Sequence, residues 1–268
     1  MAAVSLTHAL RDHYQDLFNT CIIRPERFSV IETIIDNLQA KRMRYQLVAD
    51  GTGIPWFFVA VIHNMESSLS FKRHLHNGDP LTARTVHVPT GRPRQGAPPF
   101  TWEQSAADAL ALRKLGAQTD WSLTGTLYQV EGYNGWGYRR FHPEVLSPYL
   151  WSFSNHYQSG KYVADGRWSD TAVSRQCGAA VLLRRMVESG LIDFADQPLP
   201  AEDAAPLISR YVTSKPADTL LVTRAEDLQR WLNTFPGIFV KVDGFPGERT
   251  SNAFKTVTGT FLPGDPRA

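Results

Sequence analysis

The chain has few of the residues that mark specialised protein classes. It contains only two cysteines, Cys21 and Cys177, among 268 residues, and neither belongs to a CxxC pair. A disulfide framework and a cysteine-based zinc site are therefore excluded, and two buried free thiols are expected. No apolar run approaches the roughly 20 residues that a membrane-spanning helix needs.

The chain also lacks a strong charge of either sign. Its 28 lysines and arginines exceed its 26 aspartates and glutamates by only two, so no strong field favours nucleic acid or an anionic membrane. We expect a monomer with no nucleic-acid partner and no membrane insertion. Charged side chains such as Arg11, Asp12 and Asp16 interrupt the N-terminal segment. The sequence therefore predicts synthesis in the cytoplasm without a visible signal peptide.

The apolar pattern is mostly helical and indicates a mainly α protein. Residues 28–48 follow the spacing of one amphipathic helix. Residues 56–66 are apolar on every face, which predicts a helix buried on all sides, with Thr52 as a candidate N-cap and Pro55 near its first position. Three further segments with helical pattern are residues 101–116, which begin with a Thr101–Gln104 capping box, residues 121–131 and residues 170–189.

Two other segments show how the chain is organised. Residues 82–88 alternate in side-chain character within a stretch rich in glycine and proline, which predicts a short β-hairpin followed by a long loop. Nearer the C-terminus, the acidic and proline-rich stretch "DFADQPLPAEDAAP" indicates a connection between domains. We expect a first domain over residues 1–195, a linker over 196–206 and a small module over 207–268.

Glu66 is a carboxylate at the end of the apolar run. Burial disfavours the charged form of a carboxyl group and raises its pKa, as a general acid requires. Protonation of a glycosidic oxygen uses such a group, with a second carboxylate or a positioned water on the other face of the sugar. Asp79, in the predicted hairpin, is the candidate second carboxylate, at the roughly 6.5–9.5 Å that suits inversion. Alternatively, Glu66 anchors the following loop and Asp79 is a turn residue.

Two motifs, in this order, resemble the lysozyme-like superfamily. "HNMESSLSF", which contains Glu66, resembles the glutamate-serine signature of soluble lytic transglycosylases and goose-type lysozymes. "EGYNGWGY", residues 131–138, is similar to their YN motif. The resemblance implies a lysozyme-like α+β domain with a small β hairpin, in which Glu66 is the general acid. It also implies that Tyr133 and Asn134 shape the sugar site.

Other residues near these motifs are candidates for contact with the same substrate. By analogy with other lysozyme-like hairpins, Thr82 and Thr85 are candidates for orienting a water molecule. Glu131, Trp136 and Tyr138 belong to the YN segment and are candidates for facing the sugar. The aromatic side chains that are candidates for stacking on a sugar, with burial in the core as the alternative for most of them, are Trp136, Tyr138, Tyr149, Trp151 and Tyr157.

The tail of the chain carries a second resemblance. Residues 227–259, with "LQ..LN" followed by "VDG..G..T..A", look like a peptidoglycan-binding module. The pattern predicts a short helix, a turn over 243–247, a cap at Thr250 and a second helix that presents Phe254 and Val257. The resemblance implies that the catalytic domain is tethered to its polymer, which raises its effective concentration there.

Together the two resemblances imply a peptidoglycan glycan-strand hydrolase, of muramidase or endolysin type, that cleaves β-1,4 bonds without a cofactor. It would act at the cell wall, which without a visible signal peptide suggests release through a membrane lesion or delivery by a dedicated machine. The open alternatives are a lytic transglycosylase, a chitosanase or chitinase of the same fold, and a non-catalytic wall-binding protein.

A metal site is the remaining chemical alternative. Four histidines, with Asp79 among them, lie in one stretch of the chain, at positions 63, 74, 76 and 87. No HExxH or CxxC pattern accompanies them, so we expect no metal.

Overall fold

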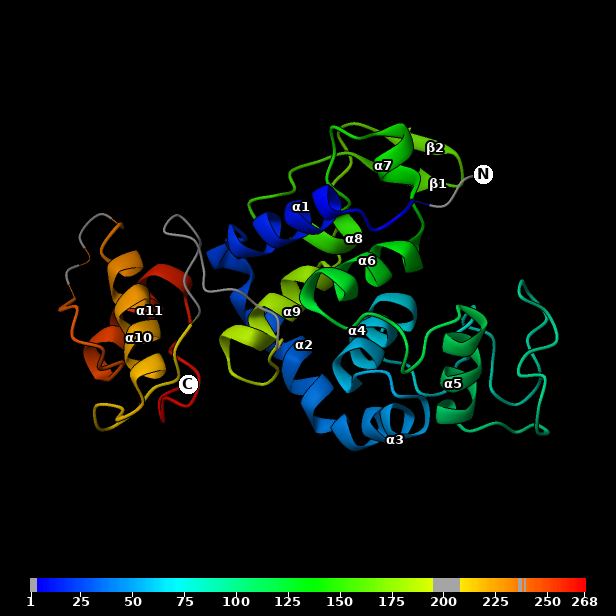
Figure 1. Ribbon diagram of the computed structural model, residues 1–268, viewed down its shortest axis with the longest axis horizontal. Helices are drawn as coiled ribbons and strands as arrows, with labels where there is room; N and C mark the ends of the chain where they lie inside the picture. The colour runs from blue at the N-terminus through cyan, green and yellow to red at the C-terminus, as the bar shows by residue number, and fades with distance from the viewer. Residues whose placement is uncertain (1–3, 195–207, 236–237, 239) are drawn as a thin grey trace.

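The computed structural model describes residues 4–194, 208–235, 238 and 240–268. Within these residues the protein is mainly α-helical, with eleven α-helices, one short 3-10 helix and one two-stranded antiparallel sheet. Figure 1 shows a larger helical body and a smaller C-terminal lobe. The prediction of a mainly α chain with a small β element is confirmed at this level. The linker expected over 196–206 lies outside the described residues.

The body contains most of the secondary structure. Its helices are α1 (His8–Asn19), η1 (Pro25–Arg27), α2 (Phe28–Ala40), α3 (Arg42–Thr52), α4 (Trp56–Ser67), α5 (Trp102–Leu112), α6 (Leu123–Asn134), α7 (Gly137–Phe141), α8 (Pro148–Trp151) and α9 (Ala179–Glu188). The sheet pairs β1 (Lys161–Ala164) with β2 (Arg167–Ser169). The C-terminal lobe holds α10 (Thr219–Leu232) and α11 (Glu248–Thr258).

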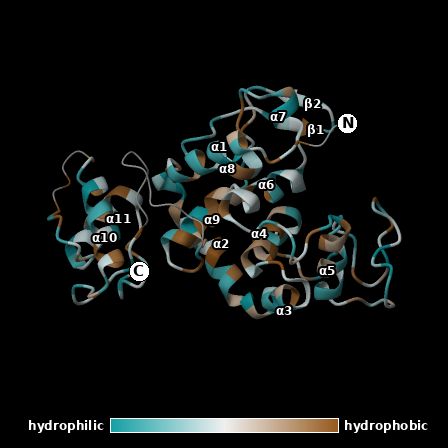
Figure 2. Ribbon diagram, in the orientation of Figure 1, coloured by the Kyte–Doolittle hydropathy of each residue, from teal (hydrophilic) through white to brown (hydrophobic). Residues whose placement is uncertain are grey.

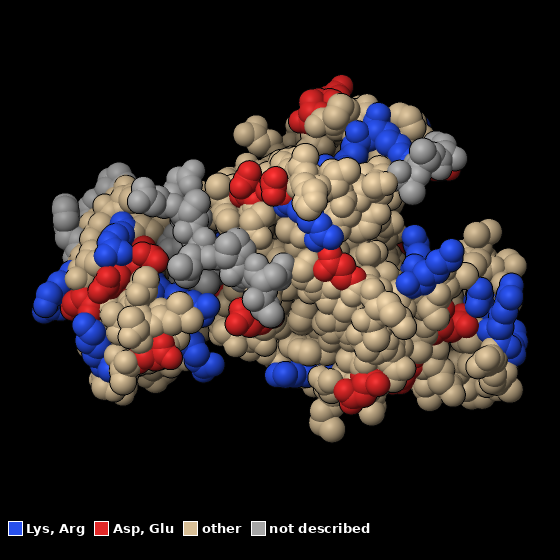
Figure 3. All heavy atoms as spheres, in the orientation of Figure 1, with Lys and Arg blue, Asp and Glu red and all other residues tan. Residues whose placement is uncertain are grey.

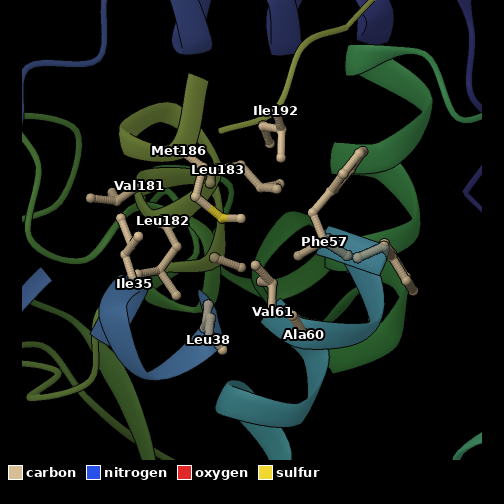
Figure 4. Close-up of a cluster of buried hydrophobic side chains, with 14 of the residues drawn as sticks. Ile35, Leu38, Phe57, Ala60, Val61, Val181, Leu182, Leu183, Met186 and Ile192 are labelled. Atoms are coloured by element: carbon tan, nitrogen blue, oxygen red, sulfur yellow. The ribbon is translucent and has the colours of Figure 1, made fainter. Parts of the chain in front are cut away.

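Helix α4 forms the centre of the body. Every residue from Trp56 to Met65 is buried, because α3, α6 and α9 pack around it. Figure 4 shows apolar side chains of α2, α4 and α9 pointing toward one another, including Leu38, Val61 and Leu183. Figure 2 shows the brown, hydrophobic residues concentrated where these helices meet. The prediction of a helix buried on all sides is confirmed, and this packing fixes the position of the end of α4.

The segment before α4 differs from the prediction in two ways. Residues 28–48 form two helices, because the chain turns at Lys41 so that the Tyr45 ring packs on α4 and α5. Thr52 is not an N-cap. It ends α3, where its hydroxyl donates to the Val48 carbonyl at 2.7 Å, and Pro55 takes the cap position of α4.

Three other helices begin or end where local signals place them. The Thr101–Gln104 capping box is present at the start of α5, as predicted. Helix α6 begins two residues later than expected, because the Ser122 hydroxyl caps it, and it continues to Asn134. Helix α9 covers only the second half of 170–189. It starts after Gly178, where a Cβ atom would lie 2.2 Å from the Leu150 carbonyl oxygen.

The hairpin predicted near residues 82–88 does not form. That region contains only an isolated bridge between Arg73 and Pro80, and the backbone N–H groups of Val86 and His87 donate to the Asp79 side chain rather than to a neighbouring strand. The sheet lies instead at 161–169. Its turn residues there, Asp-Gly between two short β-prone runs, are the strongest local hairpin signal in a sequence.

The C-terminal lobe is organised by one buried amide. Gln229 donates to Asp243 Oδ1, the Phe245 carbonyl and Thr250 Oγ1 at 3.0–3.1 Å, and its oxygen accepts from the N–H groups of Asp243 and Gly244. The predicted turn at 243–247 is therefore present. The predicted cap at Thr250 is wrong, because Gly247 takes the N-cap position of α11.

The lobe packs against the body through an aromatic contact. The rings of Phe254 in α11 and Phe28 in α2 meet edge to face, with centroids 5.7 Å apart, and both are buried. Phe254 therefore faces the body rather than solvent.

In the part of the chain that the structure describes, no single helix is long and apolar enough to span a membrane. Helices α3 and α4 together meet that test by length and composition alone, with a bend of 117° between them.

Candidate functional site

Glu66 lies in the last turn of α4. The chain turns away directly after the helix, where Ser68 and Leu69 have positive φ angles of 48° and 62°. The Tyr149 hydroxyl, from α8, donates to Glu66 Oε1 at 2.6 Å. A carboxylate from one buried helix is thus held by a phenol from another, while its side chain keeps a solvent-exposed surface.

The protein around Glu66 raises the pKa of its carboxyl group. Loss of hydration is the dominant cause, and the Tyr149 hydrogen bond and the positive charge of Arg113 act in the opposite direction. Because Glu66 is an exposed residue whose carboxyl group has a raised pKa, it can hold a proton at a place that a ligand can approach. Burial and the negative charge of Glu66 together raise the pKa values of Tyr133 and Tyr149, so both phenols stay protonated.

The YN motif forms the end of α6. Tyr133 is buried, and the Arg113 guanidinium carbon lies 4.5 Å from its ring centroid. Asn134 is the exposed last helical residue, and Gly135 ends the helix with a φ of 96°. The structure therefore brings Glu66, Tyr133 and Tyr149 into one electrostatically linked cluster with Arg113.

A cavity of about 670 Å³ opens beside this cluster. Tyr149 connects the two, because it belongs both to the lining and to the Glu66 hydrogen bond, whereas Glu66, Tyr133 and Arg113 are not lining residues. Its other walls come from the region after α6, the β1–β2 hairpin and the segment before α9, including Asn134, Tyr138, Phe141, Tyr162, Ser174 and Gln176. Gln176 also donates to the Met65 carbonyl at 2.9 Å, which fixes this wall to the end of α4. We call this space the Tyr149 cavity.

An aromatic cluster holds the hairpin wall of the Tyr149 cavity. The rings of His142 and Trp168 stack in parallel, with centroids 3.4 Å apart. Tyr138 meets Tyr162 and Trp168 edge to face. Sequence reasoning named Tyr138 and Tyr149 as possible sugar-stacking residues, but not the hydrogen bond of Tyr149 to Glu66. It missed Gln176 and the hairpin, although the Asp-Gly turn of the hairpin was a usable signal.

Glu131 and Trp136 do not line the Tyr149 cavity. Glu131 is buried, where it accepts a hydrogen bond from Tyr14 at 2.6 Å and pairs with Arg139 at 2.8 Å. Trp136 packs on Tyr128, with ring centroids 4.9 Å apart. The Glu131 carboxylate is therefore hydrogen-bonded inside the body, and the Trp136 ring, which follows α6, covers a side chain of that helix.

The Asp79 carboxylate makes its hydrogen bonds within its own loop. Its Oδ2 atom accepts from the backbone N–H groups of Val86 and His87 at 2.8 and 3.0 Å, and His87 Nδ1 lies 2.6 Å from Oδ1. These hydrogen bonds, with His87 contributing most, hold the pKa of Asp79 below its usual range. Asp79 is absent from the groups that shift the pKa of Glu66. The geometry thus gives Asp79 the role of a turn residue.

The two threonines of the same loop make no hydrogen bond to Glu66, Tyr133 or Tyr149. Thr85 is buried, and its hydroxyl donates to the Pro89 carbonyl and accepts from the Arg92 N–H. Thr82 is exposed. The hydroxyl of Thr85 therefore closes the loop and is not directed at a ligand.

The histidines of this region make hydrogen bonds within the protein. His74 Nδ1 lies 2.8 Å from Ser105 Oγ, and His76 Nε2 lies 2.8 Å from Asp108 Oδ2. His63 faces the Tyr45 hydroxyl at 3.1 Å. Among the described residues, no three potential ligands are grouped as a metal ion would require. Cys21 and Cys177 are buried free thiols, as predicted.

Comparison of the chain with protein-family models, with curated proteins and with solved structures finds no match. The resemblance to lysozyme-like enzymes therefore rests on the sequence motifs, and the function has to be inferred from the site itself.

Proposed function

We propose that the protein cleaves the β-1,4 glycan strands of peptidoglycan, with Glu66 as the general acid. The observation that carries the proposal is the Glu66 carboxyl group. It ends a fully buried helix, keeps one exposed surface, accepts a hydrogen bond from Tyr149 and has a raised pKa. The Tyr149 cavity beside it supplies room for sugar rings, with polar and aromatic groups along its walls.

In this proposal Glu66 acts in both steps of the reaction, first as an acid and then as a base. Its proton passes to the glycosidic oxygen as the bond between that oxygen and the sugar carbon breaks. The carboxylate then takes a proton from the group that attacks the sugar carbon. Tyr149 orients the carboxyl group through its hydrogen bond, and Asn134 at the cavity rim contacts the sugar.

A lytic transglycosylase is the second candidate, and one observation favours it. The Asp79 carboxylate is hydrogen-bonded within its own loop. Among the described residues, no other carboxylate shifts the pKa of Glu66. A single acid can abstract the proton of a hydroxyl on the same sugar as readily as that of water. The first route leaves anhydro-sugar ends and the second leaves reducing ends.

The C-terminal lobe fits the proposal as a wall-binding module. Its Gln229 network holds the turn at 243–247 in one shape, and its contact through Phe254 fixes it on the body. A module held in this way keeps the site close to an insoluble polymer.

The direct test replaces Glu66 with Gln, which keeps the shape and removes the acid. We expect release of fragments from purified sacculi to fall at least about 100-fold, the range that general acid catalysis contributes. Mass spectrometry of the fragments separates reducing ends from anhydro ends. Undiminished activity in the variant would contradict the assignment of Glu66. Binding to sacculi without fragments from the wild-type protein would favour a non-catalytic wall-binding protein.

A further inference from the structure

Arg113 is a cation at the site without a carboxylate partner. It directly follows the last residue of α5, its side chain is exposed, and its guanidinium lies over the ring of Tyr133 at 4.5 Å. Among the described residues, no carboxylate forms an ion pair with it, although Glu66 is near enough to interact electrostatically.

Two other arginines of the body contact both an aromatic ring and a carboxylate. Arg44 lies over Phe71 and also pairs with Glu103, and Arg139 lies over Tyr14 and pairs with Glu131. In these cases the ring and a carboxylate together satisfy the guanidinium. Arg27 and Arg42 also lie over rings, those of Phe153 and Trp56, without a carboxylate partner among the described residues, so what sets Arg113 apart is its place beside Glu66 and Tyr133. Arg113 has the ring, and its hydrogen-bonding edge remains available beside the site.

The contact with Tyr133 prepares the guanidinium for an anion. Stacking on an aromatic face restricts a guanidinium without using its N–H groups, and a planar fork of N–H donors matches a carboxylate in two-point contact. Tyr133 is itself buried at the end of α6 next to Glu66. The cation is therefore held at a fixed place close to the general acid.

We propose that Arg113 binds a carboxylate carried by the glycan substrate, so that the site selects peptide-bearing, acidic glycan over neutral or cationic glycan. This inference rests on the proposed function and specifies its substrate. The stem peptides of peptidoglycan carry carboxylates, whereas chitin is neutral and chitosan is cationic. Arg113 thus discriminates among the three polymers that a lysozyme-like site could accept.

The electrostatics of the site support such a ligand. The positive charge of Arg113 lowers the pKa of Glu66, which opposes its protonation. A substrate carboxylate on Arg113 would offset that charge and favour the protonated acid at the moment when the glycosidic bond is in place. Binding of the acidic substrate and protonation of Glu66 would then assist each other.

The test measures binding by calorimetry in the Glu66→Gln background, so that no ligand is cleaved. The ligands are soluble glycan-peptide fragments and the same fragments with their carboxylates converted to amides. We expect Arg113→Gln to weaken binding of the acidic fragments about 10- to 100-fold, as loss of a charged hydrogen-bonded pair does. For the amidated fragments, the parent and Arg113→Gln should bind equally. Lys114→Gln is the matched control, because it removes a neighbouring exposed charge, and it should bind both ligands like its parent.

Three outcomes would overturn the inference: equal affinities of the parent and Arg113→Gln for the acidic fragments, an equal loss for both ligands, or no binding of either ligand. A second measurement, in protein with Glu66 intact, separates the effect of the positive charge at position 113 from that of the shape of its side chain. Arg113→Gln should move the alkaline limb of the kcat/KM profile to higher pH, whereas Arg113→Lys should keep the limb near its wild-type position. If Glu66→Gln retains full activity, the proposed function fails. If Glu66→Gln is inactive and Arg113→Gln behaves like wild type, only the inference fails.

Discussion

At the scale of single residues, Tyr149 opposes the effect of burial on the pKa of Glu66. The Tyr149 hydroxyl donates to the carboxylate at 2.6 Å and so stabilises its charged form. This hydrogen bond lowers the pKa of Glu66, while loss of hydration raises it by more. In the proposed reaction Glu66 is a general acid, which works only while protonated, so we expect activity to fall as the pH rises through the pKa of Glu66.

Replacing Tyr149 with Phe removes the hydrogen bond and leaves the ring. We expect the pKa of Glu66 to rise further and the alkaline limb of kcat/KM to move to higher pH. We also expect kcat to fall roughly 10-fold, about 1.4 kcal/mol, because the carboxyl group loses its orientation. Tyr128→Phe is the control, since that hydroxyl donates to the Val4 carbonyl instead. A pH profile of Tyr149→Phe that matches wild type would refute this role.

Asp79 is expected to act on stability rather than on catalysis. Its pKa is lower in the folded protein than in the unfolded chain, so its stabilising contribution is present above the unfolded pKa of about 3.9 and is lost as the pH falls. Asp79→Asn should therefore unfold at a lower temperature at pH 7 and differ less from wild type near pH 3. Thermal unfolding across this range checks the sign, and cleavage of sacculi by the folded variant should stay near the wild-type rate. A loss of activity as large as that of Glu66→Gln would restore Asp79 as a catalytic group.

At the scale of elements, the junction between α8 and α9 supports the Glu66 site. Helix α8 carries Tyr149, and Gly178 at the start of α9 sits against the Leu150 carbonyl. A methyl group on Gly178 would lie 2.2 Å from that oxygen, so α8 and α9 would have to separate.

Gly178→Ala is therefore expected to cost about 1–3 kcal/mol of unfolding free energy, as overpacking does. Gly51→Ala is the matched change, because Gly51 lies in α3 with no atom within 4 Å of its added Cβ. That change should instead stabilise the protein by roughly 0.5–1 kcal/mol through helix propensity. Urea unfolding measures both, and equal effects of the two changes would show that the contact with α8 is not decisive.

At the scale of the whole molecule, charge is spread without a dominant sign. Figure 3 shows lysines, arginines and acidic residues interspersed over the visible face of both the body and the C-terminal lobe. Selection of an anionic polymer would therefore depend on local groups such as Arg113. The lobe would add affinity for the polymer rather than a long-range field.

Gln229→Ala tests the contribution of the lobe. The change removes five hydrogen bonds from a buried amide, leaves the N–H groups of Asp243 and Gly244 without their acceptor, and should cost about 1–3 kcal/mol in the lobe. We expect weaker retention on sacculi in a pull-down assay, with cleavage of soluble fragments maintained. Gln46→Ala serves as the control, because that amide bonds Asp50 within α3 in the body. Unchanged retention would show that the lobe is not the wall-binding part.

The sequence by itself determined the mainly α class, the buried helix before Glu66 and the capping box of α5. These features follow from local periodicity and capping, which depend only on residues that are close together in the sequence. It also singled out the YN segment, in which Tyr133 belongs to the Glu66 cluster and Asn134 and Tyr138 line the Tyr149 cavity.

Only the tertiary structure decided which groups surround Glu66. Tyr149 and Arg113 come from separate elements, and no local pattern links them to α4. The predicted partner Asp79 has the right chemistry, but the backbone N–H groups of its own loop occupy its carboxylate. Local patterns can predict that a side chain is buried or that a helix ends. Which carboxylate is left with an exposed surface and a raised pKa depends on how distant segments pack.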